Sequence, residues 1–186
     1  MRIISGLWKG KAISVPQEGT RPSTDRTRQA LFSILLNVVE NARVLDLYSG
    51  SGALALECLS RGSATATAVD ADKHACRVIT QNARTLQANK LQVIQSETLP
   101  FLDKHVGSYT LLFADPPYER SFIGSELQLT LSHERLPQIM DDEAIFIAES
   151  PSKLNEEELA ILPDYWSVLS RRKYGKSHIT IFQYSA

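Results

Sequence analysis

Between residues 43 and 150, short apolar runs alternate with segments of helical periodicity, and this alternation constrains the fold more than any other feature. Strands that alternate with helices form a parallel sheet, because each crossover helix lies on one of its two faces. The apolar runs that indicate buried strands are residues 43–49, 64–72, 91–95, 109–115 and 143–150. The helical patterns are residues 51–62, 73–87, 122–136 and 155–162, with an earlier one at residues 20–39 that Ser23 or Thr24 can cap.

The two ends of the chain follow a different pattern. Residues 165–172 and 178–185 are strand-like, and the five residues between them are too few for a crossover, so we expect an antiparallel hairpin. The fold class is therefore α/β, with a mostly parallel seven-stranded sheet that ends in this hairpin. Residues 2–15 alternate loosely around Gly6 and Gly10, which predicts a short β-hairpin. We expect an N-terminal β-hairpin extension, residues 1–20, and a main domain, residues 21–186.

Cysteine, histidine and hydropathy patterns narrow the class of protein. Cys58 and Cys76 fall within predicted helices and form no Cys-x-x-Cys pair, which indicates reduced core thiols. The four histidines show no metal-ligand spacing. The first ten residues lack the apolar core of a secretory signal, and no apolar run approaches the roughly 20 residues of a membrane span. We therefore expect a cytoplasmic protein that binds neither a metal nor a membrane.

Acidic residues close four of the predicted strands. In open α/β sheets the ligand binds outside the carboxyl ends of the strands, near the point where the strand order reverses. One acid at such a position has no special meaning, but four are difficult to explain by packing alone. The four acids are Asp46, Asp70, Glu97 and Asp115.

The turn between the first strand and its helix contains Gly50 and Gly52. Glycines at this position let the backbone approach a ligand and adopt unusual dihedral angles. Asp70, which ends the next strand, can accept hydrogen bonds from both hydroxyls of a ribose. The spacing also fits the Gly-x-Gly-x-x-Ala fingerprint of dinucleotide-binding proteins. The pattern therefore indicates an adenosine-containing ligand without deciding which one.

Asp46 favours one of these ligands. A loop that binds a pyrophosphate does not favour a carboxylate at its entrance, because like charges repel at short range. S-adenosylmethionine carries a sulfonium and an ammonium group, so an acid before the glycines suits it better. The alternative for Asp46 is a helix-capping or turn-anchoring role. Glu97 has two interpretations as well: it reaches the adenine amine, or it lies on a surface helix.

The sequence Asp-Pro-Pro-Tyr, residues 115–118, follows the fourth predicted strand. Beside the methyl group of S-adenosylmethionine, Asp115 would accept hydrogen bonds from an exocyclic amine and orient the lone pair of its nitrogen. Pro116 and Pro117 fix the loop and leave carbonyl oxygens free as acceptors. Tyr118 would stack on a planar base, which contributes roughly 1–3 kcal/mol. A base must leave its stack to reach this loop, so we expect an unpaired or flipped nucleotide.

These motifs resemble those of a known family. The segments DLYSGSG and DPPY, with Asp70 between them, are similar to those of the amino-group-directed methyltransferases that use S-adenosylmethionine. The segments MRIISGLWKGKAISVP, TRPSTDRTRQALFSIL and RRKYGKSHITIF further resemble the RsmD family. Its members are bacterial enzymes with a Rossmann-like fold that methylate the N2 amine of a guanine in 16S ribosomal RNA. The resemblance covers nearly the whole chain.

The resemblance implies roles for individual residues. It implies contacts with the target base from Asp115, Pro116, Pro117 and Tyr118. At the third acidic position the family often has Asp, whereas this chain has Glu97. The cofactor contacts that it implies are those of Asp46, Ser49, Gly50, Gly52 and Asp70, with Glu97 as a further candidate.

The resemblance also gives a role to the uneven charge of the chain. The net charge is −1, but residues 1–28 hold six lysines and arginines against two acids. By resemblance, these cations hold the RNA backbone. The expected partner is 16S ribosomal RNA or a partly assembled small ribosomal subunit. The candidate RNA-binding residues are Arg21, Arg26, Arg28, Lys9, Lys11 and Arg172.

Three alternatives remain open from the sequence. The Asp-Pro-Pro-Tyr motif is shared with enzymes that methylate adenine N6 or cytosine N4, although we find no separate DNA-reading module. A nicotinamide-dependent oxidoreductase would use the same glycine turn but would leave Asp46 and residues 115–118 unexplained. A non-catalytic RNA-binding protein would not need the chemical residues that are present.

Overall fold

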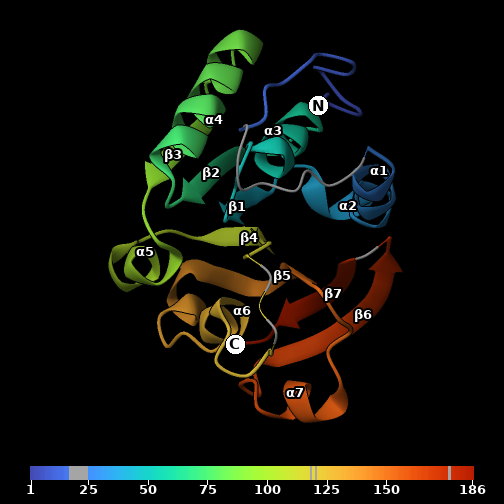
Figure 1. The fold of residues 1–186 in the computed structure, drawn as a ribbon, viewed down its shortest axis with the longest axis vertical. Coiled ribbons are helices and arrows are strands. Elements are labelled where there is room, and N and C mark those ends of the chain that lie inside the picture. The colour runs from blue at the N-terminus through green and yellow to red at the C-terminus, as the bar shows by residue number, and fades with distance from the viewer. Residues whose placement is uncertain (17–24, 118, 120, 176) are drawn as a thin grey trace.

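A seven-stranded sheet crosses the middle of the molecule in the computed structural model, which describes residues 1–16, 25–117, 119, 121–175 and 177–186 (Figure 1). The strand order is β3-β2-β1-β4-β5-β7-β6. The first five strands pair in parallel, as the alternation of strands and helices predicts. The strands are β1 (Arg43–Leu47), β2 (Thr65–Asp70), β3 (Leu91–Gln95), β4 (Tyr109–Ala114), β5 (Met140–Ser150), β6 (Trp166–Tyr174) and β7 (Ser177–Tyr184).

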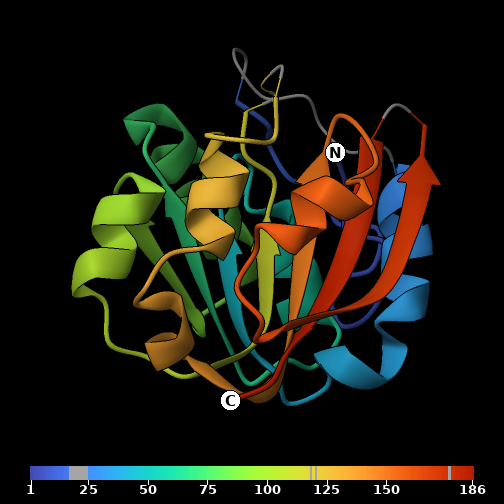
Figure 2. The ribbon, with the colours of Figure 1, turned by 90° about the horizontal axis from the view of Figure 1, so that it is seen from below.

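Helices cover both faces of this sheet and divide the core into two layers. One layer contains α1 (Asp25–Ile34), α2 (Leu36–Val39), α3 (Ala53–Ser60) and α4 (Lys73–Leu86). The other contains α5 (Thr98–Lys104), α6 (Glu126–Leu131), the 3-10 helix η1 (Leu136–Ile139) and α7 (Glu156–Ala160). Seen from below, α6 and α7 lie in front of the strands (Figure 2).

The central strands are apolar along their whole length because both of their faces are buried. Side chains alternate between the two faces of a strand. In β4, Leu111 and Phe113 pack into the layer of α3 and α4, whereas Leu112 and Ala114 pack into the layer of α5 and α6. This double burial fixes the register of the strand ends, which carry the acidic residues.

The C-terminal hairpin is confirmed, and its second strand has an unexpected neighbour. Strand β7 pairs antiparallel with β6 on one side and with β5 on the other. The last strand in the sequence is therefore interior to the sheet, and β6 forms the edge. A register shift between Val168 and Ser170 interrupts the pairing of β6, and Leu169 beside it is 54% exposed.

The N-terminal hairpin prediction is only partly correct. The segment folds back on itself, but its strand pairing is reduced to one antiparallel bridge between Arg2 and Ala12. Backbone hydrogen bonds from the Ile3 amide to the Lys11 carbonyl, at 3.0 Å, and from the Gly10 amide to the Ile3 carbonyl, at 2.9 Å, accompany this bridge. The segment also bonds to α3: the amides of Ile4 and Ser5 donate to the carboxylate of Glu57, at 2.7 and 3.0 Å. Gly6 has φ +78°, and a Cβ there would lie 1.8 Å from the carbonyl oxygen of Ser60. The boundary predicted at residue 20 lies outside the described residues.

Three helical segments differ from the sequence prediction. The first is broken at Leu35 into α1 and α2, and its predicted caps, Ser23 and Thr24, lie outside the described residues. Helix α5 was not predicted. The pattern at residues 122–136 yields α6, with η1 following it. Among the described residues, no helix is long and apolar enough to cross a membrane.

Candidate active site

The neighbouring parallel strands β1, β2 and β4 bring the predicted acids together at their carboxyl ends. Asp46 of β1 lies beside Ala68 of β2 and Phe113 of β4 in the pairing register. Asp115 directly follows Ala114, which pairs with Leu47 on one side and with Ala148 on the other. Segments far apart in the sequence therefore place Asp46, Asp70 and Asp115 around the carboxyl ends of β1, β2 and β4.

The glycine turn between β1 and α3 has the positive φ angles that its glycines suggest. Gly50 and Gly52 have φ values of 54° and 72°, in the region that side chains disfavour. A Cβ on Gly52 would lie 2.9 Å from Cγ2 of Ile79 on α4. Glycine is therefore needed at this position both for the turn and for the close approach of α4.

Ser49 and Asp70 hold the glycine turn against β2. The Ser49 hydroxyl donates to the carbonyls of Asp46 and Val69, and its amide donates to the carbonyl of Val69 at 3.0 Å. The Gly50 amide donates to Oδ2 of Asp70 at 2.7 Å, and the Asp72 amide donates to Oδ1 at 2.9 Å. A carboxylate has about four acceptor positions, so Asp70 can accept further hydrogen bonds while it holds the turn.

Asp46 is 2% exposed and has the anchoring role that the sequence left as an alternative. Its Oδ2 accepts the Ala55 amide in the first turn of α3, at 3.1 Å. Burial raises the pKa of Asp46 well above its usual range, the Ala55 amide lowers it, and the charges of Asp115 and Asp70 raise it further. A positive charge beside this carboxyl group would lower its pKa and favour the ionised form.

Asp115 is the less buried of the two site acids whose pKa is raised. Burial, and then the charge of Glu149, raise the pKa of Asp115 from 3.8 to about 8. Glu149 follows Ala148 of β5 and was not among the predicted site residues, although it closes an apolar run as the other acids do. None of the ion pairs between described residues involves Asp46, Asp70 or Asp115. The site therefore gathers carboxyl groups that have no ion-pair partner among the described lysines and arginines.

The loop after β4 borders a small cavity. Pro116 is buried and Pro117 is exposed. Both line a cavity of about 60 Å³ between residues 116–127 and 149–158. Tyr118, predicted to stack on the base, lies outside the described residues.

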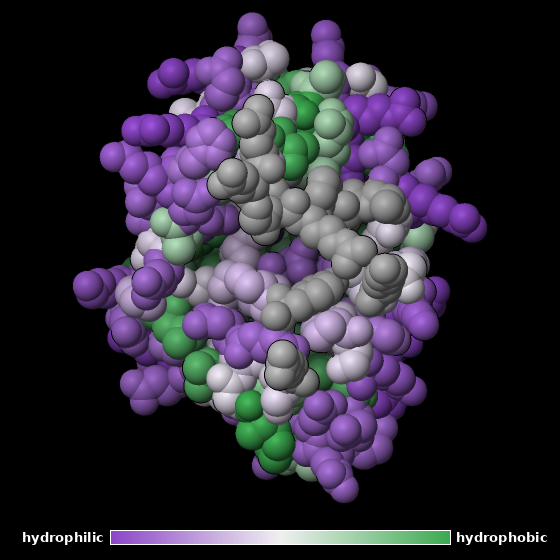
Figure 3. All heavy atoms as spheres, in the orientation of Figure 1, coloured by the Kyte–Doolittle hydropathy of each residue, from purple (hydrophilic) through white to green (hydrophobic). Residues whose placement is uncertain are grey.

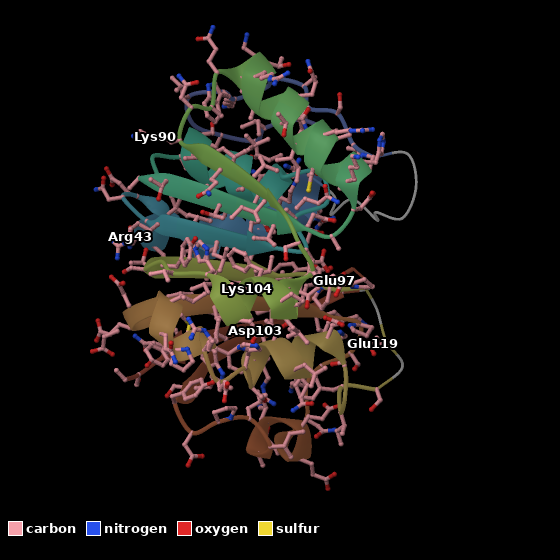
Figure 4. The ribbon with its side chains drawn as sticks, turned by 90° about the vertical axis from the view of Figure 1, so that its left-hand side faces the viewer. Arg43, Lys90, Glu97, Asp103, Lys104 and Glu119 are labelled. Carbon is pink, nitrogen blue, oxygen red and sulfur yellow. The ribbon has the colours of Figure 1, made fainter. Side chains whose placement is uncertain are left out.

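Glu97 lies at the carboxyl end of β3 and begins α5. It is exposed, and its side chain forms no capping hydrogen bond with the helix. In Figure 4, Glu97 lies on the same side of the molecule as Glu119, opposite Arg43 and Lys90. Glu97 is therefore the N-cap residue of a surface helix and lies just beyond the carboxyl end of β3.

Asn82 of α4 is a site residue that sequence reasoning missed. It is 3% exposed, and its Nδ2 donates to the carbonyl of Ser51 in the glycine turn at 3.1 Å. The same side chain accepts the Ser14 amide at 2.8 Å and donates to the Ser14 carbonyl at 2.9 Å. Asn82 therefore connects the N-terminal segment to the glycine turn. Its signal in the sequence is a polar residue on the apolar face of α4.

The candidate RNA-binding residues divide into three groups. Lys9, Lys11, Arg26 and Arg172 are exposed. Arg21 lies outside the described residues. The prediction for Arg28 is wrong in this structure: it is 1% exposed, and its Nη2 donates to Asp25 at 2.8 Å and to the Arg2 carbonyl at 2.7 Å. Its guanidinium joins the N-terminal segment to α1 and is not presented to a ligand.

Comparison with known proteins assigns the chain to a family. The family described as "Conserved hypothetical protein 95" matches residues 1–183. The chain belongs to this family. Ribosomal RNA small subunit methyltransferase D of Escherichia coli strain K12 is 34% identical over 187 residues, which cover 100% of this chain and 91% of the relative. The resemblance to the RsmD family is thereby confirmed.

Two further relatives have the same extent as this chain. A putative rRNA methyltransferase of Bacillus subtilis is 30% identical and covers 98% of both chains. The solved structure of a putative methyltransferase from Escherichia coli has a TM-score of 0.87 and 34% identity, and the match covers 100% of this chain and 98% of that one. The RsmD family fold, a Rossmann-like methyltransferase fold, therefore extends over the whole chain.

Proposed function

We propose that this protein transfers a methyl group from S-adenosylmethionine to the exocyclic N2 amine of a guanine in 16S ribosomal RNA. Its family and its full-length relatives make it an rRNA methyltransferase. The observation that carries the choice of methyl donor is the group of acids at the ends of β1, β2 and β4. These acids surround a glycine turn and form no ion pairs with other described residues.

The residues of the glycine turn suit S-adenosylmethionine, which supplies a methyl group on a positively charged sulfur. Gly50 and Gly52 let the backbone lie close to the ligand, and Asp70 keeps acceptor positions for ribose hydroxyls. Asp46 is a buried carboxyl group beneath the turn, and a cationic ligand would favour its ionised form. A pyrophosphate-bearing cofactor would meet repulsion from the same carboxylates.

Asp115 is the proposed catalytic residue. It would accept a hydrogen bond from the target amine, direct the lone pair of the nitrogen, and stabilise the positive charge that the amine gains as it is methylated. Pro116 and Pro117 keep the loop rigid, and Tyr118 would stack on the base. Most of the rate enhancement in such a site comes from positioning.

The test supplies methyl-labelled S-adenosylmethionine to the protein together with unmodified 16S RNA, small ribosomal subunits and DNA in parallel. The labelled polymer is digested and the methylated nucleoside identified. We expect N2-methylguanosine from RNA or subunits. N6-methyladenine or N4-methylcytosine would overturn the substrate, and calorimetric binding of NADH in place of S-adenosylmethionine would overturn the reaction.

The raised pKa of Asp115 predicts that cofactor binding releases a proton. The acid is protonated below about pH 8 in the free protein, and a cationic ligand favours its ionised form. Release of one proton lowers the affinity by about tenfold for each pH unit below that value. Calorimetry between pH 6 and 9, in buffers of different ionisation enthalpy, measures both the affinity and the released protons.

S-adenosylhomocysteine is the matched control ligand, because it has the same ammonium group but no sulfonium charge. We expect a weaker pH dependence for it, and little difference between the two ligands in Asp115→Asn. Equal pH dependence of the two ligands in the unmodified protein would contradict the proposed coupling between the sulfonium charge and the ionisation of Asp115.

A further inference from the structure

The exposed face of α4 carries positive charge without any acid. Residues 73–96 contain Lys73, Arg77, Arg84 and Lys90 and no aspartate or glutamate. At 100° per residue, Lys73, Arg77 and Arg84 fall within about 40° of one another and span roughly 16 Å along the helix. All three are exposed, whereas Ala75, Ile79 and Leu86 on the opposite face are buried. We call Lys73, Arg77 and Arg84 the α4 stripe.

The α4 stripe has no acidic partner among the described residues, unlike five arginines elsewhere in that part of the chain. Among the described residues, Arg2 and Arg28 pair with Asp25, Arg43 with Asp141, Arg61 with Glu57 and Arg171 with Glu156. Within the same part of the chain, no ion pair involves the α4 stripe. The opposite face mixes its charges, as Asp103 and Lys104 on α5 show (Figure 4). An acid-free row is therefore a property of α4 and not of the surface in general.

The α4 stripe begins at the candidate active site. Lys73 is the first residue of α4, and the preceding residues Asp70 and Asp72 use their carboxylates to accept the amides of Gly50, Asp72, His74 and Ala75. Hydrophilic side chains cover the upper left of the view in Figure 3, where Figure 1 places α4. The N-terminal segment lies beside this helix, since Asn82 of α4 binds Ser14. The exposed cations Lys9 and Lys11 belong to that segment.

We propose that the α4 stripe binds the phosphodiester backbone of the RNA that flanks the target nucleotide. Unpaired cations in a row suit a polyanion, because each contact releases a counterion from the nucleic acid. The α4 stripe extends away from the candidate active site. RNA bound to it therefore flanks the nucleotide that is methylated. This inference rests on the proposed function and adds a surface to it, since the sequence indicated RNA contacts only in the N-terminal stretch and at Arg172.

The test compares two double variants with the same change in net charge. Arg77→Glu/Arg84→Glu reverses two charges of the α4 stripe. Lys104→Glu/Lys153→Glu reverses two exposed lysines that form no ion pair with described residues. Lys104 lies on α5, in the opposite helical layer. Binding to unmodified 16S RNA is measured across salt concentrations, together with S-adenosylmethionine affinity, kcat and the KM for RNA.

We expect the α4 variant to bind RNA at least tenfold more weakly, with its KM raised by a similar factor and its kcat and cofactor affinity kept. The neutral variant Arg77→Gln/Arg84→Gln should lower the slope of log K against log salt by about 1.4, for two lost contacts with single-stranded RNA. RNA affinity and salt slope equal to those of the Lys104 and Lys153 control would overturn the inference. Absence of N2-methylguanosine with the unmodified protein would instead overturn the proposed function. The two failures can be told apart because RNA binding is measured separately from methyl transfer.

Discussion

Asp115→Ala is expected to lower kcat/KM for methyl transfer by about 10³-fold, the size of effect seen when one preorganised electrostatic contact with the reacting group is removed. The carboxylate is the group proposed to hold the target amine, and an alanine leaves the amine without an acceptor. Cofactor binding should change far less, because Asp46 and the glycine turn are retained. Single-turnover transfer with labelled cofactor measures the loss, and calorimetry measures the binding.

The conservative variant Asp115→Asn separates catalysis from folding. A folded-state pKa raised from 3.8 to about 8 means that folding stability from this group is full below about pH 4 and is lost as pH rises through about 8. Asparagine cannot ionise, so the variant should gain a few degrees in Tm over the unmodified protein at pH 8 and above. Asp164→Ala, at an exposed acid, is the control and should change neither the Tm nor the rate of methyl transfer. Normal transfer by Asp115→Ala would remove Asp115 from the mechanism.

Glu57→Ala is expected to have the largest effect on stability, a loss of about 3–5 kcal/mol in the free energy of unfolding. Glu57 is fully buried, accepts the amides of Ile4 and Ser5, and accepts Nε of Arg61 at 2.7 Å. Removing the carboxylate leaves two partly buried amides and a guanidinium without their acceptor. Urea denaturation measures the loss, and hydrogen exchange at Ile4 and Ser5 should accelerate as the N-terminal segment leaves α3.

The control for Glu57 is Glu40→Ala, at an exposed glutamate that should cost less than about 0.5 kcal/mol. If Glu57→Ala costs less than about 1 kcal/mol, the carboxylate is not what holds the N-terminal segment. Weaker RNA binding with unchanged cofactor affinity would show that the segment serves the RNA. This result would follow because Lys9 and Lys11 are carried on the same segment.

Strand alternation and strand-end acids were predictable because both depend on local pattern. A parallel strand buried on both faces must be apolar throughout, so Leu111–Ala114 could be assigned to a strand without knowledge of its neighbours. In any sheet of this kind, the acid that follows such a run lies at the carboxyl end of its strand, where ligands bind. Asp46, Asp70 and Asp115 therefore met as expected.

Contacts between distant segments were not predictable by the same reasoning. Glu57 and Asn82 are polar residues on apolar helix faces, and only the three-dimensional structure shows that the N-terminal backbone supplies their partners. The N-terminal hairpin was predicted from local alternation, which could not show that α3 also accepts hydrogen bonds from its backbone. Arg28 belongs to a basic stretch of sequence, yet its guanidinium is buried against Asp25. The basic composition of this stretch therefore did not reveal which of its side chains are buried.

The interior position of β7 affects how the protein can be synthesised. A ribosome adds roughly 5–20 residues each second, and β7 emerges after β6 although it separates β6 from β5. Until β7 has emerged, β5 and β6 each lack a neighbour and present open edges to other nascent chains. A translation product that stops before Ser177 would therefore leave one edge of β5 and both edges of β6 unpaired, and we expect it to aggregate in the cell even though β1 to β5 are complete.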